Sequence, residues 1–299
     1  MSTIEKASKR LEELRKAGIE TPWASSPAEQ PAAESADPIP VPVAAAKNPP
    51  AARLLPPKQR VEIDLDRLER ICYVVPRGQR SALMNEFRSI KHPLLANVRD
   101  GKSSGREGRN NLIMVTSALP GEGKTFTAVN LAMSIAMEVD QKVMLVDADT
   151  IRMGAADRLG LKEHRGLLDI LADPSMALSE AELSTNVDNF TFLSAGTRNE
   201  CATELLSSQA MRRLLDLLAA DQKRIVVFDA PPLLPSAEAR VLAPQMGQVL
   251  IVVRAGKTPQ GMVMQALGSV ESCPLVMTLL NQSRARSDAS RYGYYYYSS

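Results

Sequence analysis

The chain is poor in cysteine, in histidine and in aromatic residues outside one terminal group of tyrosines. Its 299 residues include 3 Cys, 2 His, 1 Trp and 5 Phe. Cys72, Cys201 and Cys273 lie far apart and show no paired spacing, so the sequence predicts neither a disulfide framework nor a zinc site and is typical of a reducing compartment. His92 and His164 are isolated and are interpreted as surface or capping residues.

Long apolar runs and an excess of charge of one sign are also missing. No stretch of about 18 apolar residues occurs, and the start MSTIEKASKR has no apolar signal-peptide core. We therefore expect a cytoplasmic protein that neither spans a membrane nor is exported. Lys and Arg total 36 against 34 Asp and Glu, a formal charge of +2. This balance argues against a broad basic field for nucleic acid, so no nucleic-acid partner is expected.

Changes in composition predict four segments along the chain. Residues 1–18 form an amphipathic helix that opens with the capping-box pair Ser2 and Glu5; it is either frayed in solvent or docked on a partner. Residues 19–60 form a disordered linker, because ten of the 20 prolines lie there together with many alanines. A folded domain follows over residues 61–283, and residues 284–299 form a flexible tyrosine-rich tail.

The folded segment alternates short apolar runs, rich in β-branched residues, with helical patterns. The expected strands are 112–115, 143–146, 190–193, 225–228, 249–253 and 275–280. The expected helices are 65–71, 81–98 with a bend at Pro93, 125–138, 203–220, 236–243 and 260–271. Buried strands that alternate with helices predict an α/β fold, in which helices cover both faces of a parallel β-sheet.

A phosphate-binding motif directly follows the first long strand. The run ALPGEGKT from Ala118 to Thr125 matches the P-loop pattern G-x-x-x-x-G-K-[ST], except that Ala118 replaces the first glycine. The glycines let backbone N–H groups close on phosphate oxygens, the lysine reaches the outer phosphates, and the threonine can ligate Mg²⁺. We expect ATP and Mg²⁺ as ligands. The expected nucleotide contacts are Pro120, Gly121, Glu122, Gly123, Lys124, Thr125 and Phe126.

Three carboxylates stand at the ends of two further strands. Asp229 follows the run 225–228 and is placed like a Walker B residue that holds Mg²⁺. Asp147 and Asp149 follow the run 143–146, and alternation along an extended chain puts both on the same side. We expect Thr125, Asp149 and Asp229 near the metal, and Asp147 or Asp149 accepting a proton from an attacking hydroxyl. The catalytic candidates are therefore Lys124, Asp147, Asp149 and Asp229.

In this order the motifs resemble those of bacterial tyrosine kinases of exopolysaccharide synthesis, the cytoplasmic CapB/CpsD and Wzc-type catalytic domains. The shared runs are SALPGEGKT, TAVNLA, VMLVDAD, GLLDIL, FDAPPLL, VVRAGKT and LLNQ. The resemblance covers about residues 81–299 and implies a P-loop NTPase fold of the MinD/ParA-like type. Leu119 stands where MinD/ParA ATPases carry a signature lysine, which favours the kinase branch. The N-terminal helix, the linker and the run EFRSIKHPLL further resemble the exosortase-associated autokinase subgroup.

Five of the six tyrosines lie in the last eight residues: Tyr292, Tyr294, Tyr295, Tyr296 and Tyr297. Large rings on a mobile terminus bury nothing, whereas a phenol oxygen can accept a phosphoryl group. We therefore expect an ATP-dependent tyrosine autokinase that modifies its own tail and regulates exopolysaccharide polymerisation or export. Two alternatives stay open: a MinD/ParA-like ATPase without tyrosine kinase activity, and a nucleotide-dependent scaffold whose catalysis has decayed.

The resemblance also implies partners and contacts. It implies a ring-shaped homo-oligomer with transfer between subunits, a cognate tyrosine phosphatase, and a membrane-embedded adaptor of the chain-length-determinant type that recruits the kinase to the inner face of the plasma membrane. Arg88 and Lys91 occupy the arginine positions of a helix implicated in subunit contacts. Asn281 is an implied adenine contact. Ile151 holds the position of a family arginine, and Arg152 follows it, so the arginine contact to phosphate is lost or shifted by one residue.

Overall fold

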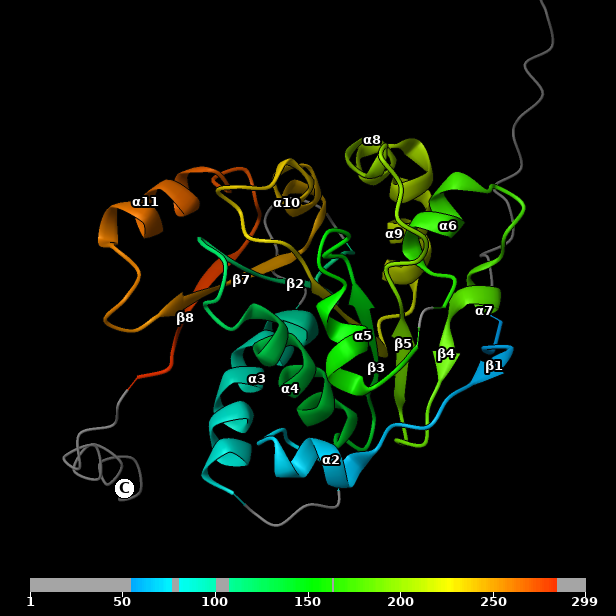
Figure 1. Ribbon diagram of the computed structural model, residues 1–299, viewed down its shortest axis with the longest axis horizontal. Coiled ribbons are helices and arrows are strands. Elements are labelled where there is room, and N and C mark those ends of the chain that lie inside the picture. Colours follow the sequence, from blue (N-terminus) through cyan, green and yellow to red (C-terminus); the bar gives the residue numbers. More distant parts are fainter. Residues whose placement is uncertain (1–54, 77–80, 101–107, 163, 284–299) are drawn as a thin grey trace, which may run out of the picture. The chain divides into compact units, whose positions relative to one another are not determined.

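The computed structural model describes residues 55–76, 81–100, 108–162 and 164–283 (Figure 1). The expected helix over 1–18, most of the expected linker and all five tail tyrosines lie outside the described residues. The strands are β1 (Gln59–Arg60), β2 (Leu112–Ser117), β3 (Lys142–Asp147), β4 (Leu183–Ser184), β5 (Phe190–Leu193), β6 (Arg224–Asp229), β7 (Gln248–Arg254) and β8 (Val276–Asn281).

The helices lie between these strands. They are α2 (Leu65–Arg70), α3 (Ala82–Asp100), α4 (Lys124–Ala136), α5 (Gly154–Leu159), α6 (Leu167–Ala172), α7 (Leu178–Ala181), α8 (Ala202–Ser207), α9 (Gln209–Ala220), α10 (Ala237–Leu242) and α11 (Gln260–Gly268), with a 3₁₀ turn at Ala243–Gln245. Each strand and helix predicted from the hydrophobic pattern is present, with ends shifted by a few residues.

The strands form one sheet in the order β1-β4-β5-β3-β6-β2-β7-β8. Neighbouring strands pair in parallel except β4 and β5, which are antiparallel. Alternation along each buried strand divides the core in two: Leu112 and Met114 face one hydrophobic cluster, and Ile113 and Val115 face the other. The predicted α/β fold is confirmed.

Different helices cover the two faces (Figure 1). Helices α2, α3, α4 and α5 supply the cluster that contains Ile113, whereas α6, α8, α9, α10 and α11 pack on the side of Leu112. Both faces of the central strands are therefore dry, and the polar groups that end these strands gather at the edge of the sheet. Strand β2 leads into the P-loop there, and Asp147 of β3 lies in register with Asp229 of β6.

Three features differ from the sequence-based expectation. Strand β1 pairs with β4, and Lys58 N donates to Ser179 O at 2.9 Å, so ordered pairing begins before the expected boundary at residue 61. The helix expected over 203–220 is divided at Ser208, whose hydroxyl caps α9 by accepting from Met211 N. The short helices α5, α6 and α7 were not expected, because each has only four to six residues.

Candidate functional site

The P-loop wraps the N-terminus of α4. Gly121 and Gly123 have φ values of 84° and 98°, in the left-handed region that favours glycine. A side chain at Gly123 would also be obstructed, because its Cβ would lie 2.1 Å from Asn281 Nδ2. Helix α4 starts at Lys124 with Gly123 as its N-cap, so its unpaired N–H groups point into the loop, as an anion-binding site requires.

A cavity of about 630 Å³ opens beside this loop. Its walls contain seven of the residues that were considered for the site on the basis of the sequence: Gly121, Gly123, Lys124, Thr125, Phe126, Asp149 and Arg152. The expected contacts Pro120 and Glu122 do not line it. The exposed Ile151 is 54% accessible, and Arg152 takes its place at the cavity. The shift of the arginine by one residue therefore keeps a guanidinium beside the P-loop.

Glu122 turns its carboxylate away from the cavity. The side chain is 3% exposed; Oε2 accepts from Leu119 N at 2.6 Å, and Oε1 accepts from the Thr258 hydroxyl. Glu122 O also accepts from Asn281 Nδ2 at 2.9 Å. The side chain of Glu122 thus fastens the P-loop to the segment after β7, and Asn281 lies against the loop backbone. Any contact of Glu122 with a nucleotide would come from its backbone.

The catalytic candidates form one buried cluster. Lys124 Nζ donates to Asp149 Oδ2 at 2.5 Å and lies 3.7 Å from Asp229 Oδ1. Asp147 accepts from Ala155 N at 3.0 Å and from Asp149 N at 3.2 Å. Asp147 and Asp229 are fully buried, whereas Asp149 lines the cavity. Asp147 is therefore placed to orient the segment that carries Asp149, and Asp149 is placed to face a ligand.

Burial makes ionisation of two of these carboxyl groups unfavourable. Desolvation, with a smaller contribution from the charge of Asp229, raises the pKa of Asp147 to about 7. Desolvation also raises the pKa of Asp229 to about 6, although Lys124 and Thr125 oppose it. Lys124 forms ion pairs with Asp149 and Asp229, and within the described ranges Asp147 forms none, so negative charge exceeds positive charge in this cluster and a further cation would be favourable.

Asp229 provides the test of whether a metal ion fits. Both of its carboxylate oxygens are buried and lack a hydrogen-bond partner within the part of the chain described. Carboxylate oxygens are preferred ligands of Mg²⁺, directly or through water. Thr125, at the start of α4, lines the cavity. No group of three or more His, Cys, Asp or Glu side chains among the described residues could hold a metal. The fit therefore depends on Asp229 together with Thr125, Asp149 and phosphate oxygens.

The cavity residues that sequence reasoning missed include Arg67, Tyr73 and Arg158. Arg67 and Tyr73 come from α2 and the segment after it, and Arg158 comes from α5. Arg67 Nη1 donates to Arg158 O at 3.2 Å, and the ring of Tyr73 lies 5.0 Å from that of Phe126. Burial raises the pKa of the Tyr73 phenol. The pattern predicted a helix over 65–71, but nothing in it showed that this helix contributes to the wall of the nucleotide cavity.

The two expected oligomer contacts differ in accessibility. Arg88 is exposed on α3. Lys91 is 7% exposed, donates to Ser134 O at 2.7 Å and forms an ion pair with Glu138 at 2.6 Å. The expectation of an intermolecular role for Lys91 is corrected, because its ammonium group joins α3 to α4 within the chain.

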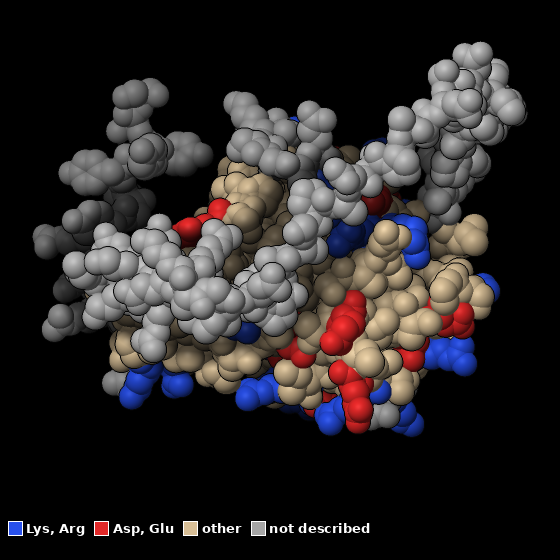
Figure 2. All heavy atoms as spheres, turned by 90° about the horizontal axis from the view of Figure 1, so that it is seen from above, with Lys and Arg blue, Asp and Glu red and all other residues tan. Residues whose placement is uncertain are grey.

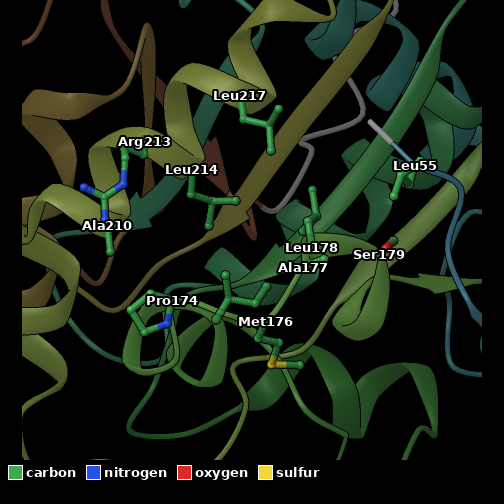
Figure 3. Close-up of a pocket in the computed structure, with 11 residues that line it drawn as sticks. Leu55, Pro174, Met176, Ala177, Leu178, Ser179, Ala210, Arg213, Leu214 and Leu217 are labelled. Carbon is green, nitrogen blue, oxygen red and sulfur yellow. The ribbon is translucent and has the colours of Figure 1, made fainter. Parts of the chain in front are cut away.

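A second, mostly apolar cavity of about 330 Å³ lies away from the P-loop (Figure 3). Met176, Leu178 and Ser179 lie on one side of it, Ala210, Leu214 and Leu217 of α9 on the other, and Leu55 at the rim. It contains none of the phosphate-binding residues or carboxylates and is not part of the site. Over the described ranges, no helix has both the length and the apolar character needed to cross a bilayer.

Comparison with known proteins shows which family of proteins the chain resembles. A family model described as an AAA domain matches residues 110–270. The chain is 33% identical to the tyrosine-protein kinase YwqD of Bacillus subtilis over 185 residues, which are 61% of this chain and 76% of YwqD. It is 34% identical over 149 residues to a putative tyrosine-protein kinase in the cps region of Klebsiella pneumoniae, covering 50% of this chain and 20% of that protein. The chain spans 20–26% of the length of such longer relatives.

Solved structures support the same assignment. The VpsO kinase domain superposes with a TM-score of 0.56 and 25% identity, covering 67% of this chain and 96% of that domain. Cobyrinic acid a,c-diamide synthase of Mycobacterium smegmatis, solved with magnesium and either an ATP analogue or ADP, shares the fold with a TM-score of 0.50 at 22% identity, covering 60% of this chain. The named relatives favour the kinase over the MinD/ParA-like ATPase. Since the family model covers more than half of the chain and YwqD is matched over three quarters of its length, the chain belongs to the bacterial tyrosine-protein kinases, which transfer phosphate from ATP to protein tyrosine.

Proposed function

We propose that this kinase phosphorylates its own C-terminal tyrosine cluster, Tyr292, Tyr294, Tyr295, Tyr296 and Tyr297. The observation that supports this most is the position of Gln282. Gln282 lines the P-loop cavity and follows the last strand, β8, so the chain passes the nucleotide site ten residues before Tyr292. The donor site and the acceptors are therefore near each other in the sequence.

The residues around the cavity suit ATP with Mg²⁺. The P-loop N–H groups and Lys124 would hold the phosphates, while Thr125, Asp149 and Asp229 would hold the metal. When bound, Mg²⁺ supplies neutralisation of the charge that develops on the phosphate oxygens. Asp229 supports this assignment, because its carboxylate is buried and its ion pair with Lys124 is long, at 3.7 Å.

Proton removal from the acceptor is assigned to Asp149. A free tyrosine titrates near pH ~10, so a base must take its proton during transfer. Of the three carboxylates, that of Asp149 lines the cavity. Asp147 holds Asp149 in position by accepting a hydrogen bond from Asp149 N. Lys124 donates to Asp149 in the structure. When Lys124 turns to the outer phosphates, it frees the Asp149 carboxylate to accept the phenolic proton.

The acceptor tail is proposed to come from a neighbouring subunit of a ring, by resemblance to the family. Each phosphotyrosine adds about −1.5 to −2 charges. Several of them near the buried carboxylates would repel one another and the site, so full phosphorylation is proposed to dissolve the ring until a cognate phosphatase reverses it. A membrane-embedded adaptor of the chain-length-determinant type would recruit and activate the kinase at the inner face of the plasma membrane. The cycle would regulate exopolysaccharide polymerisation or export.

Labelled ATP tests the proposal. Purified full-length protein, with and without the adaptor's cytoplasmic segment, is incubated with γ-labelled ATP and Mg²⁺, and the peptide that contains residues 284–299 is analysed by mass spectrometry. Phosphate on the tail tyrosines is expected for the wild type, with a loss of about 10²-fold or more in rate for Lys124→Met and Asp149→Asn. Release of free phosphate with every tail tyrosine unmodified would support the ATPase alternative.

A further inference from the structure

A second polar cavity lies next to the nucleotide site. It has a volume of about 450 Å³ and is lined by Met153, His164, Arg165, Gly196, Thr197 and Arg198. Arg152 and Gly154, the chain neighbours of Met153, line the nucleotide cavity instead. Met153 adopts a left-handed conformation with φ 49°, and its N–H donates to Asp149 O at 2.7 Å. The two cavities are therefore separated by a single segment, 152–154, which is bonded to a catalytic carboxylate residue.

The sheet order places this cavity on the side away from the P-loop. Strand β3 leads to Asp147 and Asp149, and β5 pairs with β3 in parallel on the opposite side from β6 and β2. Gly196, Thr197 and Arg198 follow β5, so they extend the row of strand ends beyond the carboxylates. A peptide that presents one residue to Asp149 can thus present another residue to this cavity.

The cavity is equipped to bind a doubly charged anion. Arg165 and Arg198 are both exposed, and neither forms an ion pair with any other described residue. One oxygen of the nearby carboxylate of Asp169 is engaged by backbone donors, since Oδ2 accepts from Gly166 N at 2.8 Å and Thr197 N at 3.1 Å. Guanidinium groups bind phosphate in a bidentate fork. Figure 2 shows the side that faces upward in Figure 1; where described residues are visible there, Lys and Arg are mixed with Asp and Glu, so this face is not generally basic.

We propose that this cavity, defined by His164, Arg165 and Arg198, binds a phosphotyrosine of the tail while another tyrosine of the same tail occupies the catalytic site. This rests on the proposed autokinase function. In an extended peptide, residues two apart lie on one side and are separated by roughly 6.6 Å. Tyr292, Tyr294 and Tyr296 have this spacing, as do Tyr295 and Tyr297. The first phosphate therefore holds the tail in place for the next, and modification becomes progressive.

An unphosphorylated tail gains nothing from this cavity. The run from 284 to 291 contains Arg284, Arg286 and Arg291 against Asp288, and such a segment is repelled by two more arginines. Recognition thus depends on the phosphate that the enzyme itself adds. One phosphate fills the cavity, so later phosphates remain outside it and still contribute the repulsion that dissolves the ring.

Peptide binding tests the proposal without any turnover. A fluorescent peptide of residues 284–299 is titrated with nucleotide-free kinase, either unmodified or carrying phosphate on Tyr294. We expect the phosphopeptide to bind about tenfold or more tightly. The preference should disappear in the double variant Arg165→Gln/Arg198→Gln and persist in the control Arg213→Gln, which removes an exposed arginine at the apolar cavity. Equal binding of both peptides to the wild type overturns the proposal.

Addition of ADP and Mg²⁺ identifies which cavity binds the phosphate. Since the two cavities share no lining residue, the preference should survive saturating ADP; its loss would mean that the phosphate occupies the P-loop and would overturn the proposal. In the full chain, the double variant should accumulate singly phosphorylated tails while the first phosphate enters at the wild-type rate. A wild type whose tail is never phosphorylated contradicts the autokinase function, and the peptide titration still decides the present proposal.

Discussion

At the scale of single residues, two buried carboxylates, those of Asp147 and Asp229, oppose the stability of the fold when they are charged. The pKa of Asp147 is raised to about 7 and that of Asp229 to about 6, mainly by burial. Because both values exceed the ordinary value near ~3.9, the folded protein binds more protons than the unfolded chain between pH ~4 and ~7. Their contribution to stability is therefore present at acid pH and is lost as the pH rises through this window. The site keeps these charges because phosphoryl transfer requires them.

Replacement of Asp229 by asparagine should raise the stability of the fold and lower kinase activity. In metal-free and nucleotide-free protein at pH 8, Asp229→Asn should raise the free energy of unfolding by about 1–3 kcal/mol, since a buried charge is removed. The melting temperature should rise by several degrees, and the gain should shrink toward pH 4. Tail phosphorylation should fall by at least about 10²-fold. The control Asp140→Asn changes an exposed carboxyl group and should shift stability by less than about 0.5 kcal/mol. An unchanged melting temperature in Asp229→Asn would show that burial does not disfavour this charge.

Gly123 is the residue at which backbone conformation and close packing coincide. Gly123→Ala should weaken ATP binding at least about tenfold and lower stability by about 1–3 kcal/mol, because a Cβ there meets Asn281 at a left-handed φ. Gly261→Ala is the matched control, since a Cβ at that helical position meets nothing within 4 Å; it should be neutral or stabilising by about 0.5–1 kcal/mol. Nucleotide titration and thermal melting of the two variants measure both effects. Equal ATP affinity in both variants would contradict the steric argument.

At the scale of elements, helix α3 carries one basic residue that packs within the domain and one that is exposed to solvent. Lys91 joins α3 to α4 through Ser134 O and Glu138, whereas Arg88 is exposed. Lys91→Ala should therefore lower the free energy of unfolding by about 1–3 kcal/mol, because a buried carbonyl and a carboxylate lose their partner.

Arg88→Ala should leave the melting temperature unchanged and alter the assembly mass measured by light scattering with ATP present. The reverse pattern, in which Lys91→Ala changes only the assembly and Arg88→Ala only the stability, would return the intermolecular role to Lys91.

The strong elements of the fold were predictable because each carries its own pattern. Strands such as β2 and β6 are continuous apolar runs, and α4 begins at the Lys-Thr pair of a recognisable motif. The two-residue strands β1 and β4 carry no such pattern, and their pairing is visible only in the folded chain. Helix α5 was missed because it starts after Met153, whose left-handed conformation a methionine rarely adopts.

The residues of the candidate site also fall into a group that the sequence predicted and a group that it did not. Asp147, Asp149 and Asp229 were identified because parallel strands end at one edge of a sheet. Arg67, Tyr73 and Arg158 were not, because they reach the cavity through packing between segments far apart in the sequence. The role of the Glu122 side chain was likewise not predictable from the sequence. Its place in the P-loop motif suggested a ligand contact, and only the tertiary contact with Thr258 reveals a buried brace.

At the scale of the whole molecule, the sheet begins in the segment assigned to the linker. A chain that starts at residue 55 retains β1, with Lys58 N bonded to Ser179 O and the ion pair of Lys58 with Glu180. A chain that starts at residue 61 loses this pairing and leaves β4 as an open edge. We expect the shorter chain to unfold at a lower temperature, with a loss of about 1–3 kcal/mol. Identical melting curves for the two chains would place the boundary at residue 61 after all.

The position of Gln282 in the wall of the nucleotide cavity has a kinetic consequence. Tyr292 lies ten residues farther along, a span of at most roughly 33–36 Å even when fully extended. A tether this short gives the tail a local concentration on the order of millimolar around the sites that it can reach. In the proposed ring, in which each tail serves a neighbouring site, the supply of acceptors would not depend on the total amount of protein. Under the proposed autokinase function each molecule offers five phenols, so self-modification would end after five transfers until a phosphatase removes the phosphates.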